Sequence, residues 1–317
     1  INISFIGAGS YAQGNLLQNI PKNNAVARVG VLTNTGTTSK RVAEKFKFQF
    51  CATKEADVLD DKTNTVFVAT RHDSHGPYVL KSLKANKNVF VEKPLCLLES
   101  ELEAIIEAQS KANKAVMVGF NRRFSPLTTK LKKAIGNNPM TMLYRINAGA
   151  IPGDNWIQDL EIGGGRVLGE VCHFIDYLTY LNGSLPVKIS ATALPNPNNL
   201  NDTLNILIQF ENGSSGIVAY YANGSKSMTK EYVEVFSAGQ SAILNDFKEL
   251  KIYGKGKPKK TKILNQNKGQ KEMVEAFVNG LLKVGKAPIP FQDIVAVTKA
   301  SFKVIESVKR GGEQVEI

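Results

Sequence analysis

The first 119 residues alternate short apolar runs with longer amphipathic segments, and this rhythm constrains the fold more than any other feature of the sequence. The runs that predict strands are 3–6, 29–32, 65–69, 88–91 and 115–118. Apolar residues at helical spacing predict crossover helices over 39–46, 77–85 and 98–113. Because strands that are joined through helices pair in parallel, the rhythm indicates a doubly wound parallel sheet.

Beyond residue 119 the pattern changes to that of an α+β domain. Helices are predicted over 127–135, 167–181, 271–282 and 294–308. Strands are predicted at 142–148, 188–194, 204–210, 216–221, 232–237, 242–244 and 250–253. Turn sequences between these strands, such as Glu211-Asn212-Gly213, favour a large, mostly antiparallel open sheet. We therefore expect an α/β protein with one domain over 1–120 and a second over 121–317, whose last helix could pack back on the first.

The bulk composition excludes several classes of protein. No apolar run reaches the roughly 20 residues of a membrane-spanning helix, and no signal peptide is recognisable, so a cytoplasmic protein without a membrane partner is expected. The spacing of Cys51, Cys96 and Cys172 argues against a disulfide framework and a zinc ribbon. Lys and Arg outnumber Asp and Glu by 12. Their densest stretch, 255–262, is interpreted as a solvated hairpin tip, and no nucleic-acid partner is expected because no recognition motif accompanies the charge.

A glycine motif directly after the first predicted strand indicates a nucleotide site. Gly7-Ala8-Gly9-Ser10-Tyr11-Ala12 fits G-x-G-x-x-[G/A] and precedes a helix-compatible stretch. In a Rossmann domain the first glycine permits a tight turn, the second admits the pyrophosphate, and the helix N-terminus attracts its charge. A glycine-containing turn without a ligand is the alternative. The position of the motif at the start of a βαβ array favours the cofactor, with Gly7, Gly9, Ser10, Tyr11 and Ala12 in contact with it.

The end of the second predicted strand bears on the choice of cofactor. An NAD site usually places an acid there, but no Asp or Glu precedes Glu44. Hydroxyl, amide and cationic side chains are found instead: Thr33, Asn34, Thr35, Lys40 and Arg41. Such a loop would accommodate a 2′-phosphate, so NADP is slightly preferred over NAD. The alternative is that Lys40 and Arg41 begin a solvated helix face.

Val91-Glu92-Lys93-Pro94 follows the strand predicted at 88–91. Ligands of open α/β sheets bind beyond the carboxyl ends of the strands, so Lys93 is placed where a nicotinamide ring and a substrate could meet. With these pieces the sequence resembles the Gfo/Idh/MocA family of oxidoreductases, such as glucose-fructose oxidoreductase and inositol dehydrogenase. The other matching strings are 69–75 (ATRHDSH), 119–124 (GFNRRF), Gly163-Gly164-Gly165, 173–176 (HFID) and 288–290 (PIP). The strings 151–154 (IPGD) and 169–173 (GEVCH) resemble a subgroup fused behind a zinc-type alcohol dehydrogenase-like domain, so a longer fused polypeptide is expected.

The resemblance implies a catalytic pair. Lys93 would lie beside the nicotinamide and hold the reacting hydroxyl, while His173 would be the acid/base, a role that suits the pKa of imidazole. A satisfied core histidine is the alternative for His173. Many members carry an Asp four residues before this His, where this chain has Gly169. Glu170 is the nearest substitute, three residues before His173 on an adjoining helical face.

The remaining site residues come from the same strings. Cofactor contacts are expected from Thr70, Arg71, His72, His75, Glu92, Lys93, Pro94 and Arg122, with His75 near the nicotinamide riboside. Substrate contacts are expected from Lys93, Arg123, Asp154, Trp156, His173 and Asp176. The histidines at 72 and 75 are weak evidence for a metal, and no metal site is predicted.

These residues predict an NAD(P)-dependent oxidoreductase. It would transfer hydride between the nicotinamide and a secondary alcohol or ketone of a carbohydrate-like substrate, such as a sugar, sugar acid or sugar nucleotide. In this interpretation the first domain binds the dinucleotide, and the second binds substrate and forms a homodimer or homotetramer. The alternative, which the missing Asp supports, is a non-catalytic sensor or scaffold that binds the cofactor.

Overall fold

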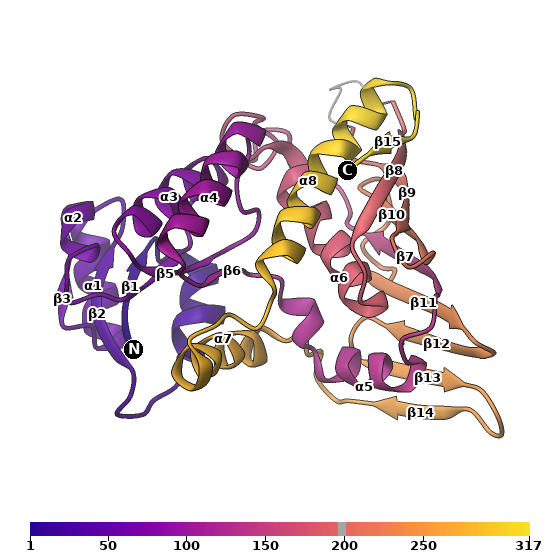
Figure 1. The fold of residues 1–317 in the computed structure, drawn as a ribbon, viewed down its shortest axis with the longest axis horizontal. Helices are drawn as coiled ribbons and strands as arrows, with labels where there is room; N and C mark the ends of the chain where they lie inside the picture. The colour runs from indigo at the N-terminus through magenta and orange to yellow at the C-terminus, as the bar shows by residue number, and fades with distance from the viewer. Residues whose placement is uncertain (196–200) are drawn as a thin grey trace. The chain divides into compact units, whose positions relative to one another are not determined.

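The computed structural model describes residues 1–195 and 201–317. The chain divides into two compact units (Figure 1). The first unit contains 1–119 and 270–295, and the second contains 120–269 and 296–317. The sequence assigned all of 121–317 to the second domain, whereas the segment 270–295 belongs with the first unit.

The first unit is built on a parallel sheet. Among the described residues its strands are β1 (Asn2–Ile6), β2 (Ala27–Leu32), β3 (Phe50–Cys51), β4 (Thr65–Val68), β5 (Asn88–Val91) and β6 (Val116–Val118). They lie in the order β3-β2-β1-β4-β5-β6, and every neighbouring pair is parallel. The predicted Rossmann-type sheet is therefore confirmed. The sequence missed β3 because two residues are too short to show an alternating pattern.

Helices cover both faces of this sheet. They are α1 (Gly36–Phe46), α2 (Glu55–Val58), α3 (His75–Lys84), α4 (Glu99–Ala112) and α7 (Gln270–Val284), with short turns η1 (Ala12–Leu16), η2 (Leu17–Asn19) and η3 (His72–Ser74). In Figure 1, α3 and α4 lie on one side of the sheet and α7 on the other. Phe67 stacks between Phe5 and Phe90, with ring centroids 4.8 and 4.7 Å away, and Phe277 of α7 packs edge-on against Phe67 at 5.7 Å. These contacts explain why α7 belongs to the first unit.

The second unit is built on a mixed sheet. Among the described residues its strands are β7 (Thr141–Asn147), β8 (Pro186–Ala193), β9 (Leu204–Phe210), β10 (Ser215–Tyr221), β11 (Glu231–Ser237), β12 (Gln240–Asn245), β13 (Glu249–Tyr253), β14 (Lys259–Lys262) and β15 (Val315–Glu316). Their order is β14-β13-β12-β11-β7-β10-β9-β8-β15. The pair β7–β10 is parallel and the other pairs are antiparallel, so the predicted mostly antiparallel sheet is confirmed.

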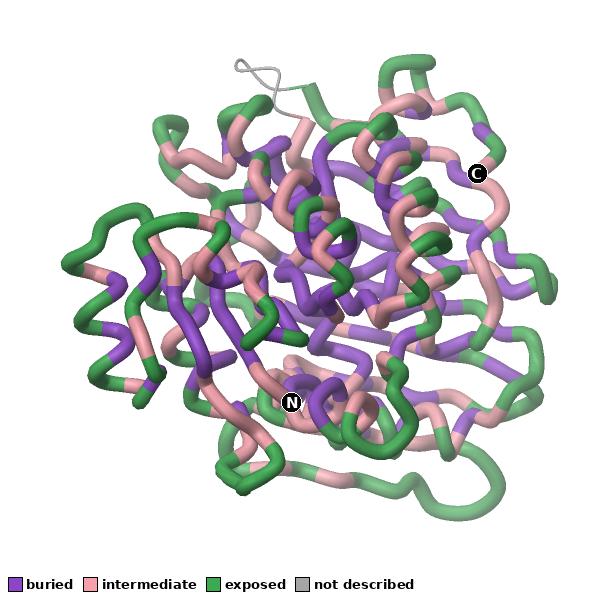
Figure 2. Tube along the Cα trace, turned by 60° about the vertical axis from the view of Figure 1, so that its left-hand side comes forward, coloured by how far each residue is buried: buried purple, intermediate pink, exposed green. Residues whose placement is uncertain are grey.

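One face of the mixed sheet is covered by helices of its own unit. They are η4 (Asn121–Phe124), α5 (Pro126–Ile135), η5 (Val167–Val171), α6 (Cys172–Asn182) and α8 (Phe291–Lys309), which begins in the first unit. Alternate residues are buried in strands such as β9 and β11, and Figure 2 shows buried stretches in the interior of the trace. In β9 every second residue is buried, whereas Leu207 points outward and is 44% exposed. The opposite face of the sheet is thus open within the unit.

Two local expectations are corrected. The stretch 255–262 was interpreted as a hairpin tip, but 259–262 forms the edge strand β14, which pairs with β13 and leaves its lysines exposed. The helix expected after the glycine motif is irregular, with a π turn (η1) followed by a 3₁₀ turn (η2). None of the described helices is long and apolar enough to cross a membrane.

Candidate active site

The glycine turn after β1 has the backbone that the motif predicts. Gly7 has a φ of +85°, and a Cβ there would lie 2.4 Å from the Ala69 carbonyl oxygen, so only glycine fits. The Gly7 N–H donates to the Leu32 carbonyl at 2.9 Å, which ties the turn to the end of β2. The turn is therefore fixed by both neighbouring strands.

Space for a ligand lies over the second glycine of the motif. No atom lies within 4 Å of a Cβ built on Gly9, and Ser10 and Tyr11 of the first helical turn are exposed, whereas Ala12 is buried. A backbone with this much free space at the start of a helical turn can receive a diphosphate. These residues fit the adenine-dinucleotide cofactor that the motif predicts.

The loop after β2 is held by its own hydroxyl groups. The Thr35 side chain caps α1 by accepting a bond from the Thr38 N–H at 3.3 Å, and the Thr33 N–H donates to Ser39 Oγ at 2.9 Å. This cap starts α1 at Gly36, three residues before the predicted start. Asn34, Thr35, Lys40 and Arg41 are exposed, which leaves the two cations available to an anion.

His75 connects the loops after β4 and β5. The ring is fully buried, with Nδ1 2.7 Å from the Pro94 carbonyl oxygen and Nε2 3.2 Å from the Thr70 carbonyl oxygen. Burial lowers the pKa of His75 to about 4, so the ring is neutral at pH 7. Because both ring nitrogens face backbone carbonyls, His75 positions the two loops. His72 is also buried, with its ring centroid 5.6 Å from that of His75, while Arg71 is exposed.

A buried carboxyl group stands next to Lys93 at the end of β5. Glu92 is 7% exposed, and burial raises its pKa to about 7 despite the Lys93 charge and hydrogen bonds from the Lys93 N–H and the Tyr11 hydroxyl. Its Oε1 atom has no hydrogen-bond partner. A Cβ on Gly119, after β6, would lie 2.7 Å from that oxygen. Tyr11, Glu92 and half-buried Lys93 thus meet at the edge of the sheet where the glycine turn lies, because parallel strands end together.

In the second unit His173 lies in the first turn of α6. It is 6% exposed, and its ring centroid is 5.9 Å from that of Phe120. One turn earlier, in η5, the Glu170 carboxylate accepts a bond from the Tyr220 hydroxyl at 2.8 Å and lies 3.8 Å from the Arg166 guanidinium. Single π turns such as η5 are frequent at functional sites. Tyr220 and Arg166 thus both contact Glu170, and the sequence suggested neither contact.

Arg122, for which a cofactor contact is predicted, lies in a buried ion cluster. Its Nε and Nη2 atoms donate to Glu231 at 2.6 and 3.0 Å, and Lys268 Nζ lies 2.7 Å from the same carboxylate. The Tyr144 hydroxyl also donates to it. Burial alone would raise the pKa of Glu231, but Arg122 and Lys268 hold it well below its usual value. Arg122 therefore forms a two-nitrogen ion pair with the Glu231 carboxylate.

Two of the predicted substrate residues are also paired with each other. Arg123 donates to Asp176 through Nε and Nη2, with the Nε to Oδ2 distance 3.0 Å, and the side chains are 4% and 1% exposed. A buried charge needs a partner, so this pair fixes η4 against α6. Two more of the six predicted substrate residues lie in the loop after β7, where Asp154 is exposed and Trp156 is half-buried.

One sequence signal could have revealed the Glu231 cluster. Glu231 begins β11 at an inward position, in register with the buried residues Val233 and Val235. An acid on the buried face of a strand requires a cationic partner. Which cation pairs with it could not be predicted, because Arg122 is 109 residues away.

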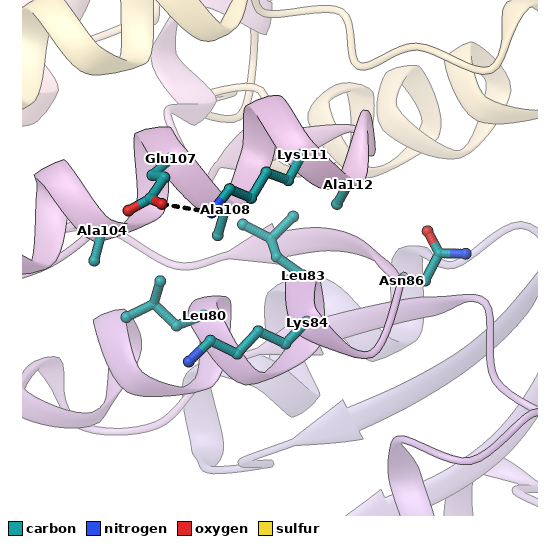
Figure 3. Close-up of a pocket in the computed structure, with 9 residues that line it drawn as sticks. All are labelled: Leu80, Leu83, Lys84, Asn86, Ala104, Glu107, Ala108, Lys111 and Ala112. Atoms are coloured by element: carbon teal, nitrogen blue, oxygen red, sulfur yellow. Dashed lines mark hydrogen bonds and ion pairs between the residues drawn. The ribbon is translucent and has the colours of Figure 1, made fainter.

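A groove of about 590 Å³ lies elsewhere, between α3 and α4 (Figure 3). Leu80 and Leu83 line it from α3, and the exposed pair Glu107 and Lys111 lines it from α4. None of the predicted site residues lines this groove, so we do not assign it to the site. No group of three His, Cys, Asp or Glu side chains within 1–195 and 201–317 could hold a metal ion.

Comparison with protein families gives two matches from one family. The profile described as "Oxidoreductase family, NAD-binding Rossmann fold" matches residues 1–120, and "GFO/IDH/MocA C-terminal domain" matches 139–239. The first match covers the parallel sheet and the glycine turn, and the second covers most of the mixed sheet.

The individual curated relatives match this chain at low sequence identity. Myo-inositol 2-dehydrogenase of Thermotoga maritima is 27% identical over 170 residues, which cover 51% of this chain and 50% of the relative. The uncharacterized oxidoreductase YrbE of Bacillus subtilis is 25% identical over 252 residues, covering 76% of this chain and 72% of the relative. For most of the curated relatives, unlike YrbE, the match spans about half of the relative's length.

Among solved structures, levoglucosan dehydrogenase in complex with NADH and levoglucosan superposes with a TM-score of 0.87. The superposition covers 100% of this chain and 99% of that one, at 20% identity. At this identity the likeness concerns the fold, and it extends over both units.

Proposed function

The chain belongs to the GFO/IDH/MocA family of oxidoreductases, and from this premise we propose that it transfers hydride between a nicotinamide cofactor and a carbohydrate-like substrate. The reacting group would be a secondary alcohol or its ketone. The names of the relatives support this substrate class, since inositol and levoglucosan both carry secondary hydroxyl groups.

One observation carries the proposal. The open backbone at Gly9 and the Glu92-Lys93 pair lie at the same edge of one parallel sheet. That edge is where open α/β sheets bind dinucleotides. A diphosphate on the glycine turn would leave the nicotinamide end of the cofactor toward the end of β5, where Lys93 stands.

In the proposed mechanism this chain supplies the proton chemistry. A nicotinamide cofactor held by the glycine turn at Gly7 and Gly9 would supply the hydride acceptor for the alcohol carbon. His173 takes the hydroxyl proton, and the Lys93 ammonium orients the hydroxyl oxygen and stabilises its developing negative charge. Glu170 supports His173 from the preceding turn, and it is itself fixed by Tyr220 at 2.8 Å.

We also propose that the cofactor site accepts the 2′-phosphate of NADP. Lys40 and Arg41 are exposed on α1, and no acid lies between β2 and Glu44. Phosphate binds favourably to such cations. Removing both charges with Lys40→Ala and Arg41→Ala should weaken NADPH binding and leave NADH binding unchanged.

Cofactor binding is tested at Gly9. Gly9→Ala fits the free structure, because nothing lies within 4 Å of the added Cβ, but its methyl group would occupy the space of the diphosphate. We expect NADH affinity, measured by calorimetry, to fall about 10-fold or more, with the melting temperature unchanged. Gly14→Ala is the matched control, since its Cβ also meets nothing within 4 Å. Equal NADH affinity in Gly9→Ala and Gly14→Ala would contradict the site.

The chemical role of His173 is tested separately. His173→Ala should lower kcat about 10²- to 10⁴-fold and leave NADH affinity unchanged. If the wild-type protein binds NADH but turns over no member of a panel of sugars and polyols, a sensor or scaffold function is supported instead. The glycine at 169 is the observation that favours this second function.

We propose that the chain forms a homodimer or homotetramer through the open face of the mixed sheet. Ile217 pairs with both Leu207 and Leu143 across three adjacent strands, and Ile217 and Leu207 are 39% and 44% exposed. An apolar row of this kind favours self-association. Light scattering of Ile217→Lys should show a smaller species than the wild-type protein. Fusion to an upstream domain and a cytoplasmic location stay predictions.

A further inference from the structure

A pocket with an unusual charge lies at the amino end of β2, in the first unit. It has a volume of about 290 Å³, and its polar lining consists of Lys22, Asn23, Asn24, Arg28 and Lys47. We call it the basic pocket. None of the described residues that line it carries a carboxylate. It thus combines cations with side-chain amides, which are groups that bind anions in proteins.

Arg28 is fixed in the wall of the basic pocket by backbone carbonyls. Its Nη1 atom donates to the Phe46 carbonyl at 2.7 Å, at the end of α1. Its Nη2 atom donates to the carbonyls of Ile20 and Leu17 at 3.3 and 3.4 Å. Carbonyl oxygens carry only partial charges, so these bonds orient the half-buried guanidinium without neutralising it.

The two lysines of the basic pocket are exposed and belong to separate turns. Lys22 lies in the turn between η2 and β2, where the Asn23 side-chain oxygen accepts a bond from the Ala25 N–H at 3.0 Å. Lys47 ends α1 in a left-handed conformation, with a φ of +59° and its N–H bonded to the Ala43 carbonyl. Neither lysine forms an ion pair with a carboxylate in the described parts of the chain. Both ammonium groups are therefore available to a ligand.

The sequence explains why no carboxylate balances these charges. No Asp or Glu occurs among residues 1–43, so β1, β2 and the turns between them supply no acid. The first acid of the chain, Glu44, is exposed on α1 and does not line the basic pocket. Cations gathered without nearby acids raise the local concentration of anions.

The basic pocket is separate from the proposed cofactor site. Arg28 is the second residue of β2, whereas Thr33 and the cofactor loop follow the last residue of this strand. A strand rises about 3.3 Å per residue, so Arg28 and Thr33 are roughly 16 Å apart. Lys40 and Arg41, which we propose for the 2′-phosphate, do not line the basic pocket. An anion bound there would not displace the cofactor.

We propose that the basic pocket binds a phosphate group, free or on a small molecule, through Lys22, Arg28 and Lys47. A volume of about 290 Å³ equals that of roughly ten water molecules, which is enough for a phosphate or a diphosphate. A group with two or more negative charges gains more from three cations than a carboxylate does. The inference goes beyond the proposed function and does not depend on hydride transfer.

The test titrates anions into the protein saturated with NADH, so that the glycine turn is occupied. The probes are inorganic phosphate, inorganic diphosphate, glycerol 3-phosphate and acetate, and calorimetry measures the affinity of each. We expect diphosphate to bind about 10-fold or more tightly than acetate, with weaker binding in high salt. Tighter binding of glycerol 3-phosphate than of inorganic phosphate would identify a phosphorylated small molecule as the ligand, and the reverse order would identify the free ion.

The two exposed lysines are the residues to substitute. Lys22→Met and Lys47→Met each remove one charge and keep most of the aliphatic length. Each should weaken diphosphate binding about 5-fold or more, with NADH affinity unchanged. Lys62→Met removes an exposed lysine of the same unit that does not line the basic pocket, and it should leave diphosphate binding unchanged. Arg28 is not substituted, because the loss of its carbonyl bonds would also change stability.

Three results would overturn the proposal. The first is that none of the phosphate-bearing probes binds more tightly than acetate. The second is equal diphosphate affinity in Lys22→Met, Lys47→Met and Lys62→Met, because the anion would then bind elsewhere. The third is loss of diphosphate binding only when Lys40 and Arg41 are both changed to Ala, which would assign the anion to the cofactor loop. None of these results bears on hydride transfer, so the proposed function is tested separately.

Discussion

The two units differ in how the charge of a buried ionisable group is compensated. In the first unit, Glu92 and His75 are buried without a strong counter-charge, and their pKa values of about 7 and about 4 bring each toward its neutral form. In the second unit, Glu231 is buried beside Arg122, which holds the pKa of this carboxyl well below its usual range, and Asp176 is buried in an ion pair with Arg123. Burial is similar in both cases, so the difference arises from the neighbours.

The difference has consequences for how each unit responds to change. A group that is neutralised by burial responds to pH, because its charge can be removed by a proton. A group that is neutralised by a partner responds to mutation, because removing the partner leaves a buried charge. The first unit should therefore be sensitive to pH near neutrality, and the second to substitutions within its pairs.

The largest effect is expected from Glu231→Gln. It leaves Arg122 and Lys268 buried without a carboxylate, and breaking a buried pair typically costs about 3–5 kcal/mol. Urea unfolding monitored by circular dichroism would measure the loss. Glu234→Gln, three residues later on β11 and half-exposed, is the control, with an expected change below about 0.5 kcal/mol. Similar stability losses in the two variants would show that the pairing is unimportant.

A smaller effect with a defined pH window is expected from Glu92→Gln. The pKa of Glu92 rises from an ordinary value of 4.5 to about 7 on folding, so ionisation destabilises the folded state progressively as the pH rises from 4.5 to 7. The penalty is complete above pH 7 and reaches about 3 kcal/mol. Glu92→Gln should therefore raise the melting temperature at pH 8 and leave it nearly unchanged at pH 4.5. An equal change in melting temperature at both pH values would show that the ionisation of Glu92 is not the cause.

The smallest effect is expected from the exposed pair in the groove of Figure 3. Glu107 and Lys111 are one helical turn apart on α4, with side chains 68% and 74% exposed. Such pairs contribute about 0.3–0.5 kcal/mol, and salt screens them. Lys111→Ala should lower stability by no more than that in low salt, with no loss in 1 M NaCl. A loss as large as that of Glu231→Gln would remove the distinction between buried and exposed pairs.

The sequence predicted the two sheets better than it predicted the buried ion pairs. Both sheets followed from patterns that are local in the sequence. The missed strands were β3 and β15, which have two residues each and can form no pattern, and β14, whose lysines show no apolar alternation. Gly7 was recognisable because its backbone requirement is also local. The pairing of Arg122 with Glu231 and of Arg123 with Asp176 could not be predicted, because charge partners 53 to 109 residues apart leave no local signal. The ligand contacts expected of Arg122, Arg123 and Asp176 stay predictions.

The edge strand β14 has a consequence for the protein in concentrated solution. An unpaired strand edge is a template for adding further strands from other molecules, which leads to fibrils. Here one edge of the mixed sheet carries Lys259, Lys260 and Lys262, and the opposite edge, β15, is only two residues long. Repulsion between the lysines of β14 should disfavour pairing at that edge, and β15 is too short to pair with a strand of another molecule. The mixed sheet should therefore not add strands from other molecules, even at high protein concentration.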